Sequence, residues 1–266
     1  MRDDTPLVTI GIPTYKRADS YLRQAIQCAL DQTYPHIEII VSDNCSPDNT
    51  EALVKSFSDP RIRYHRQQVN IGPNNNFNFC LNEAKGDYFL LFQDDDAIDE
   101  DLIESCMRAA GYARHLGIIR TGTRVIDARG NVLQHCPNRV KGLPFEEFIL
   151  GWFRHRTAWY LCSTLFNTDK LRAIGGFHSR NQLLQDGMAI ARLAAKNDRA
   201  DVEEVKASFR KHGDEITFAV DVKDWVEDFL SFLNLVCRLA PDSAALLRSE
   251  GERFFSQLSY NRVTAV

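Results

Sequence analysis

The chain has 266 residues, 44% of them hydrophobic, and a net charge of −4, as expected of an ordinary water-soluble protein with one large domain or slightly more. The weak acidic charge argues against a dedicated nucleic-acid binder, which would carry a basic stripe. No run approaches the ~18 apolar residues of a transmembrane helix, and the acidic start MRDDTPLVTIGIP lacks the basic and apolar regions of a signal peptide. The seven cysteines are dispersed, with no C-x-x-C pair, which predicts reduced thiols and a cytoplasmic protein.

The chain begins with alternating predicted strands and helices. Residues 7–13, LVTIGIP, form a β-branched apolar run that predicts a buried strand. Apolar residues at helical spacing follow over residues 22–30, with Asp19 or Ser20 as the expected N-cap. Residues 37–41, IEIIV, predict a second buried strand. Strand, helix and strand within about 35 residues make a βαβ unit, and therefore a parallel sheet.

The alternation continues toward a central strand. Asp48 is the expected cap of a helix that runs to Phe57, and RIRYH at 61–65 predicts a short strand. An asparagine-rich turn, NIGPNNNFN at 70–78, is expected to open the next helix. The continuous apolar run DYFLLF at 87–92 predicts a strand in the middle of the sheet, because it is suited to burial on both faces.

After residue 100 the alternation loosens. The expected elements are a turn between two strands at 127–131, a helix at 145–153, a strand at 159–166, a helix ended by Gly175 and Gly176, a helix at 185–196, and two helices from Asp221 onward that Pro241 separates. The fold class is therefore α/β, with a mixed central sheet flanked by helices and a helical C-terminal appendage.

The last two helices contain an apolar stripe at spacings of three and four. Its members are Trp225, Phe229, Phe232, Leu233 and Val236. A stripe this rich is not left in water, so we expect it to pack on its own domain or to form a homodimer contact. Its basic neighbours are interrupted by acids, which argues against strong attraction to anionic lipid.

Three aspartates, Asp94–Asp96, follow the central strand directly. Two like charges ~4 Å apart near a protein surface repel by roughly 4 kcal/mol, and a helix cap needs only one of these side chains. A divalent cation removes the repulsion, and Mg²⁺ or Mn²⁺ combines carboxylate oxygens with substrate phosphates and water. Because ligands bind at the carboxyl edge of an open α/β sheet, the triplet predicts a metal–diphosphate site, with helix capping as the simpler alternative.

The first two strands end at the same edge of the sheet. There Tyr15 could flank a nucleotide base, Asp43 could accept a hydrogen bond from it, and Arg17 could reach the diphosphate. A turn-capping role for Asp43 is the alternative. No G-x-x-x-x-G-K-[ST] is present, which excludes a P-loop, and no G-x-G-x-x-G follows the first strand, which argues against a dehydrogenase.

Five segments together resemble family 2 glycosyltransferases over roughly residues 7–212: VTIGIPTYKR, IEIIVSDNCSPDNT, NIGPNNNFNFCLNEAKGDYFLLFQDDDAI, IGGF and LLQDGMAIARLA. The resemblance implies the GT-A fold and inverting, metal-dependent transfer from a nucleoside diphosphate sugar. We expect a GT-A domain over 1–218, with a nucleotide-binding half at 1–115 and an acceptor-binding half at 116–218. A helical extension is expected over 219–266.

The resemblance also assigns donor and metal residues. The donor-binding residues would be Pro13, Thr14, Tyr15, Arg17, Asp43, Asn70, Gly72, Asn78 and Asp94. Asp95 would be the principal ligand of Mn²⁺ or Mg²⁺, together with Asp96 and His212. Gln93 stands where the commonest family motif has its first aspartate, so a register with Asp94 and Asp96 as the D-x-D pair stays open.

The catalytic base implied by the resemblance is Asp186, in the pair Gln185-Asp186 at the start of a predicted helix. It would deprotonate the acceptor hydroxyl opposite the leaving diphosphate. The alternative is an acid that only favours a helix N-terminus. Since that position lowers the pKa of a carboxylate, a useful base would need offsetting burial.

The predicted function is transfer of a UDP-, dTDP- or GDP-linked sugar to a carbohydrate or lipid-linked acceptor, in the synthesis of bacterial cell-surface polysaccharide or glycoconjugate. No nucleic-acid partner is expected, and the protein could contact the inner face of the membrane peripherally. One alternative is a sugar-phosphate nucleotidyltransferase, which should have a glycine-rich basic loop where this chain has IPTYKRADS. The other is a nucleotide-binding or scaffold relative without transfer activity, which Gln93 keeps open.

Overall fold

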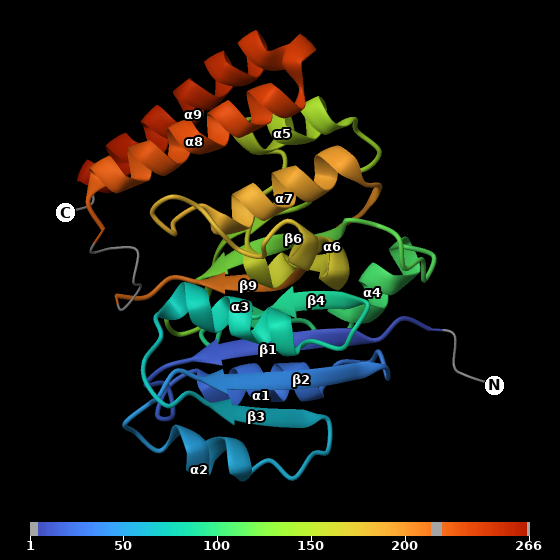
Figure 1. The fold of residues 1–266 in the computed structure, drawn as a ribbon, viewed down its shortest axis with the longest axis vertical. Helices are drawn as coiled ribbons and strands as arrows, with labels where there is room; N and C mark the ends of the chain where they lie inside the picture. Colours follow the sequence, from blue (N-terminus) through green and yellow to red (C-terminus); the bar gives the residue numbers. More distant parts are fainter. Residues whose placement is uncertain (1–4, 214–219, 265–266) are drawn as a thin grey trace.

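A mixed β-sheet runs through the protein, whose computed structural model describes residues 5–213 and 220–264 (Figure 1). Within these residues the strand order is β3-β2-β1-β4-β8-β6-β9-β5, and β7 pairs with β6. The strands are β1 (Val8–Thr14), β2 (Ile37–Asp43), β3 (Ile62–Arg66), β4 (Tyr88–Leu91), β5 (Ala97–Ile98), β6 (Ile118–Ile126), β7 (Val132–Cys136), β8 (Thr164–Asn167) and β9 (Arg199–Arg210).

Helices cover both faces of the sheet. They are α1 (Leu22–Leu30), α2 (Thr50–Lys55), α3 (Pro73–Glu83), α4 (Leu102–Ala109), α5 (Phe145–Phe153), α6 (Thr168–Ala173), α7 (Gln185–Lys196), α8 (Val222–Leu239) and α9 (Ala244–Thr264), with short 3₁₀ helices η1 (Leu161–Ser163) and η3 (Pro241–Ser243). The apolar side chains of α1, α2 and α4 form one core and those of α3 and α5–α9 form the other. In Figure 1, α8 and α9 lie at the end of the molecule farthest from α2.

The parallel half of the sheet confirms the predicted βαβ units. β1 pairs in parallel with β2 on one side and with β4 on the other, so Val8 aligns with both Ile37 and Tyr88. Every residue of β1 and β4 is buried, which confirms the prediction of a central strand at 87–92. These strands point to the left in Figure 1, and their carboxyl ends therefore meet at one edge, where the chain continues into the aspartate triplet.

Several helix starts differ from the predictions. The N-cap of α1 is Tyr21, without a side-chain cap, where Asp19 or Ser20 was expected. Asp48 lies one residue before the N-cap of α2, and its side chain accepts hydrogen bonds from Thr50 N and Oγ1 instead. Ser20 bonds the preceding loop, through Arg17 O, whereas Asp48 bonds both the first residue of α2 and the loop residue Ala18 from one position farther out.

Two other segments differ from the expected secondary structure. Most of the asparagine-rich turn lies inside α3, which begins at Pro73 because proline suits the first turn of a helix. Only the end of the segment 159–166 is a strand, since η1 precedes β8. All seven cysteines are free thiols, as predicted.

The C-terminal helices pack on the rest of the chain. The predicted apolar stripe of α8 is buried in the core that α8 shares with α5, α7 and α9, and Phe229 stacks on Phe255 of α9 at 4.2 Å between ring centroids. The stripe is therefore not available for a dimer contact. Within the described helices, no single one is long and apolar enough to cross a membrane; α8 and α9 meet that test only as a pair, across a 120° bend. The expected boundary at 218/219 lies outside the described residues.

Candidate active site

The three aspartates after β4 have three different surroundings. Asp96 is 2% exposed, and its Oδ1 accepts a hydrogen bond from the backbone N–H of Arg210 at 2.9 Å. Burial and the neighbouring Asp95 raise the pKa of Asp96 well above its usual range. Because this carboxylate anchors the end of β9, its contacts favour a structural role over the metal-ligand role expected for it.

Asp95 is the member of the triplet that contacts two cationic or titratable side chains. Its Oδ2 lies 2.9 Å from Nε2 of His212, which is buried just after β9, and 3.9 Å from Nη2 of Arg17. Arg17 Nε also lies 4.0 Å from Oδ1 of Asp94. Burial and the charge of Asp95 raise the pKa of Asp94 to about 7. Asp94, Asp95, Arg17 and His212 thus form one cluster at the carboxyl edge.

The donor atoms of this cluster fit a divalent cation that is shared with a diphosphate. Asp95 Oδ2 and His212 Nε2 lie 2.9 Å apart, a separation at which both atoms could bind one cation. No group of three or more histidine, cysteine or acidic side chains suited to holding a metal occurs in the part of the chain that the structure describes. A cation here would therefore need other oxygens, and substrate phosphates and water supply these in Mg²⁺ and Mn²⁺ sites of nucleotide enzymes.

A clamp between α1 and β9 supports this cluster, and the sequence analysis missed it. The guanidinium of Arg210 donates to the backbone oxygen of Asp95 at 2.6 Å and to Oε1 of Gln24 at 2.9 Å. It also lies 4.5 Å from the ring centroid of Tyr21, whose other neighbour is the ring of His212 at 5.4 Å. The signal available in the sequence was the position of Arg210, two residues before a histidine already expected to bind metal.

The expected base-binding residues lie beside one another at the ends of β1 and β2. Thr14 is paired with Asp43, and Pro13 with Ser42. Asp43 is 1% exposed and accepts hydrogen bonds from Ser46 N at 2.8 Å and from Tyr64 Oη at 2.7 Å. These bonds fix the carboxylate and still leave lone pairs for a ligand.

An aromatic ring and two ordered loops border this carboxylate. Tyr15, which follows β1 directly, is 39% exposed, and the Nζ of Lys16 lies over its ring, 5.0 Å from the centroid. The Nδ2 of Asn44, the residue after Asp43, donates to Oδ1 of Asn70 at 2.9 Å, and the same oxygen accepts from Gly72 N at 2.9 Å. Gly72 has φ +81° at the N-cap of α3. Asn70 and Gly72 therefore shape the wall beside Asp43.

Asp186 lies in the first turn of α7. Its Oδ1 accepts a hydrogen bond from Gly187 N at 2.7 Å. Asp186 is half-buried by solvent exposure, and its partial desolvation raises the pKa of its carboxyl to about 6, against the lowering effects of the backbone N–H groups and of the buried Arg120. The offsetting burial that a base at this position requires is therefore present, and the carboxylate is mainly ionised at pH 7 while remaining basic enough to accept a proton.

The sequence profile of Glycosyl transferase family 2 matches residues 9–173. The chain belongs to this family. An uncharacterized glycosyltransferase of Rickettsia felis is 33% identical over 186 residues, which are 68% of this chain and 30% of that protein. The succinoglycan biosynthesis protein ExoO of Rhizobium meliloti is 34% identical over 111 residues, 42% of this chain and 32% of the relative. A GalNAc(5)-diNAcBac-PP-undecaprenol beta-1,3-glucosyltransferase of Campylobacter jejuni is 34% identical over 117 residues, 42% of this chain and 38% of the relative. The matched part spans well under half of these curated relatives.

Solved structures of glycosyltransferases share the fold. Staphylococcus aureus TarS 1–349, in complex with UDP-GlcNAc, aligns with a TM-score of 0.67 at 15% identity, over 88% of this chain and 66% of that one. The mannosyltransferase PcManGT from Pyrobaculum calidifontis, in complex with GDP-Man and Mn²⁺, aligns with a TM-score of 0.64 at 16% identity, over 98% and 75%. This family 2 chain therefore has the predicted GT-A fold with a helical C-terminal region.

One donor residue expected from the family resemblance has a different set of contacts. Asn78 accepts a hydrogen bond from Phe177 N at 2.9 Å and donates to the oxygens of Phe177 and Asn74, each at 3.1 Å. Gly176 has φ +75°, and a Cβ at that position would lie 2.2 Å from Oδ1 of Asn78. The IGGF motif and Asn78 thus join α3 to the turn after α6, and the contacts favour this structural role over nucleotide binding.

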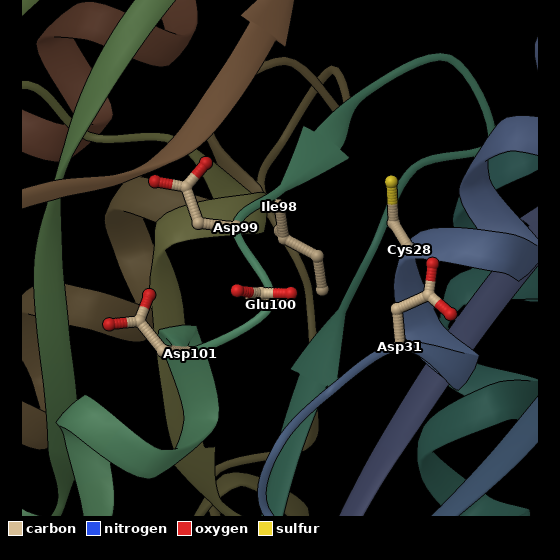
Figure 2. A pocket seen from close by; sticks show the side chains of 6 residues that line it. All are labelled: Cys28, Asp31, Ile98, Asp99, Glu100 and Asp101. Atoms are coloured by element: carbon tan, nitrogen blue, oxygen red, sulfur yellow. The ribbon is translucent and has the colours of Figure 1, made fainter.

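A hollow lies between the end of α1 and the segment that follows the triplet. Its volume is about 500 Å³, and Figure 2 shows Cys28 and Asp31 of α1 on one side and Ile98–Asp101, which follow the triplet, on the other. Two of its acids are paired with basic side chains: Asp101 bonds Lys206 Nζ at 2.6 Å, and Asp99 is paired with Arg124. We assign no ligand to this hollow.

Proposed function

We propose that this protein is an inverting glycosyltransferase that moves a sugar from a nucleoside diphosphate sugar to an acceptor hydroxyl. The observation that carries the proposal is the cluster of Asp95, His212 and Arg17 at the same sheet edge as the Asp43 carboxylate. A fixed carboxylate near exposed aromatic surface suits a nucleotide base, and an arginine beside carboxylates that can hold a divalent cation suits a diphosphate.

The donor half would bind and orient the nucleotide. Asp43 would accept a hydrogen bond from a base N–H, and the exposed ring of Tyr15 would flank the base. Arg17, held between Asp94 and Asp95, would turn part of its guanidinium toward the diphosphate and stabilise the charge that grows as the bond to the sugar breaks. When bound, a divalent cation at Asp95 and His212 would neutralise the leaving diphosphate further.

The acceptor would be activated by Asp186. This carboxylate would take the proton of the acceptor hydroxyl as its oxygen attacks the anomeric carbon from the face opposite the diphosphate. One displacement of this kind inverts the configuration at that carbon. The pKa of about 6 supports the assignment, since an effective base has a pKa near the working pH.

The relatives support a choice of donors and acceptors. The two aligned structures hold UDP-GlcNAc and GDP-Man with Mn²⁺, and the names of two relatives specify succinoglycan biosynthesis and an undecaprenol-linked glycan. We propose by analogy a UDP-, dTDP- or GDP-sugar as donor, a saccharide or lipid-linked saccharide as acceptor, and a place in cell-surface glycan synthesis at the cytoplasmic face of the membrane.

The test is incubation with UDP-glucose, UDP-GlcNAc, dTDP-glucose and GDP-mannose, each with Mn²⁺, Mg²⁺ or EDTA, in the presence of alkyl glycosides as acceptors. Metal-dependent release of free nucleoside diphosphate, with the opposite anomeric configuration in the product by NMR, is the expected result. Asp95→Asn should lose this activity, whereas Asp169→Asn, the same change at an exposed site on α6, should keep it. Turnover of a sugar phosphate with a nucleoside triphosphate would indicate a nucleotidyltransferase, and nucleotide binding without any turnover would indicate a non-catalytic relative.

A further inference from the structure

A fully buried carboxylate on α8 binds the loop that leads into α7. Asp228 is 0% exposed and accepts hydrogen bonds from Ser179 Oγ at 2.7 Å and from the backbone N–H of Asn181 at 2.9 Å. The backbone N–H groups of Leu183 and Leu184 donate to the same carboxylate at 3.0 and 3.2 Å. All four donors belong to six consecutive residues, and Leu184 is the N-cap of α7.

Further bonds attach the same loop to α8. The Nδ2 of Asn181 donates to the backbone oxygen of Asp224 at 3.0 Å. Ser179 Oγ accepts from Leu183 N at 3.1 Å while it donates to Asp228. Gln182 has φ +60°, an unfavourable conformation for a side-chain-bearing residue. Such a conformation persists only where surrounding contacts hold it, and here those contacts come largely from α8.

The position of Asp228 within α8 is energetically costly unless it serves the loop. It lies on the same face as Trp225, Phe229 and Phe232, which are buried in the core. Burying a carboxylate among apolar side chains is unfavourable unless its lone pairs are bonded. The loop supplies four donors, and hydrogen bonds to a charged group are stronger than those between neutral groups. The acid thus stabilises one particular loop conformation, which an apolar residue at this position would not do.

The loop conformation determines where Asp186 lies. Asp186 is two residues after Leu184, the last residue bonded to Asp228. A Cβ on Gly187 would lie 3.6 Å from the ring of Phe232, so the first turn of α7 packs closely on α8. We propose that Asp228 is a positioning residue for the transfer reaction: by fixing residues 179–184 on α8, it sets the orientation and burial of Asp186. The inference rests on the proposed role of Asp186 as the base.

The proposal makes the C-terminal helices part of the acceptor-side machinery, with a specific kinetic consequence. If the loop loosens, the half-buried Asp186 becomes more exposed to water, and the pKa of its carboxyl falls from about 6 toward its ordinary value. The acid limb of the pH–rate profile should then move to lower pH. The rate should fall because the base is both weaker and less well oriented, while the donor cluster on the other half of the sheet keeps its geometry.

The experiment compares Asp228→Asn with Asp224→Asn, the same chemical change one turn earlier on α8, where the loop bonds only the backbone oxygen. The readouts are kcat, KM for the donor, the pH–rate profile from pH 5 to 8, and hydrogen exchange of residues 179–184. For Asp228→Asn we expect kcat to fall by about tenfold or more, donor KM to stay within about twofold, the acid limb to move to lower pH, and the loop amides to lose protection. Asp224→Asn should resemble the unmodified protein in all four.

Two outcomes would overturn the proposal. One is a folded Asp228→Asn protein with unchanged kcat and pH profile. The other is a parallel loss of donor affinity and thermal stability with the acid limb in place, which would indicate general destabilisation. If Asp228→Asn does not fold, Ser179→Ala removes one of the four donors more gently and should shift kcat and the acid limb in the same directions; no shift refutes the proposal. Full activity of Asp186→Asn would instead refute the proposed base.

Discussion

Replacement of Asp186 by asparagine tests the proposed chemistry most directly. Asparagine keeps the size of the side chain and an oxygen that can accept from Gly187 N, but it cannot take a proton. General-base catalysis contributes about 10²–10⁴-fold, so kcat should fall by that factor, or about 3–5 kcal/mol of barrier. KM for the donor should change little, because Asp186 is not part of the cluster around Asp95.

The raised pKa also predicts a change in stability, and its sign is opposite to that of the activity. The pKa of Asp186 is raised from 3.8 to about 6, so the folded state binds the proton more tightly than the unfolded chain does. The free energy of unfolding therefore falls as the pH rises from about 4 to about 6, and the full cost persists above that range. It amounts to at most about 3 kcal/mol at pH 8 and about half of that at pH 5. Asparagine removes this cost, so the variant should be more stable, especially at pH 8.

Initial rates of nucleotide release between pH 5 and 8, with urea melts at both ends of the range, measure both effects. The unmodified protein should lose about tenfold in rate at pH 5 relative to its plateau, since roughly one-tenth of a group of pKa about 6 is then ionised. The control is Asp169→Asn, which makes the same change in the first turn of α6 at an exposed site. A variant Asp186→Asn with near-normal kcat, or one that is destabilised at pH 8, would refute the reasoning.

Three further substitutions test the donor site and the fold. Asp95→Asn should abolish Mn²⁺-dependent binding of UDP in calorimetry and leave thermal unfolding nearly unchanged, because it removes a repulsive charge. Retained affinity would eliminate Asp95 as the metal ligand. Asp169→Asn is the charge-matched control. Arg210→Lys keeps the charge but loses the forked contacts at 2.6 and 2.9 Å. The affinity for UDP should fall by about tenfold, and the free energy of unfolding by roughly 1–3 kcal/mol. An affinity equal to that of the unmodified protein would show that the clamp does not support the cluster. Gly176→Ala adds a Cβ 2.2 Å from a side-chain oxygen at φ +75°, whereas Gly142→Ala adds one at φ +73° with nothing within 4 Å. In urea unfolding, Gly176→Ala should lose more free energy of unfolding than Gly142→Ala, by at least about 1 kcal/mol. Equal losses would show that backbone strain alone is responsible.

The sequence predicted most reliably where a local pattern and its tertiary environment agree. β1, β2 and β4 are short apolar runs that are almost entirely buried. The expected parallel sheet and its ligand-binding edge follow from the order of these runs and the helices between them. Asp43 and the triplet lie at the same edge by the same rule, because β1 pairs in parallel with both β2 and β4 and all three strands end there. The start of α7 at Gln185 was likewise predictable from helical periodicity.

What the sequence did not reveal depends on contacts between residues far apart in the chain. The side-chain amide of Asn78 could bind a ligand, but a loop about 100 residues later in the chain forms hydrogen bonds with its polar atoms. Arg210 was overlooked because its partners Tyr21 and Gln24 lie almost 190 positions away, at the start of α1. Asp228 did leave a signal that periodicity could have found: an acid in the middle of the apolar face of α8 requires buried partners.

The different surroundings of the three aspartates explain how the chain tolerates them next to one another. If all three were ionised in a dry site, their mutual repulsion would be several kcal/mol. Burial and the charge of Asp95 raise the pKa values of both Asp94 and Asp96, so the flanking carboxyls hold protons more readily while Asp95 faces His212 and Arg17. The divalent cation of a bound nucleoside diphosphate would place positive charge beside the triplet, and the diphosphate would draw Arg17 partly away from the acids. Donor binding should therefore release protons from the triplet, and the heat of UDP binding with Mn²⁺ at pH 7 should depend on the ionisation enthalpy of the buffer. Equal heats in PIPES and Tris would show that the triplet is already fully ionised without the donor.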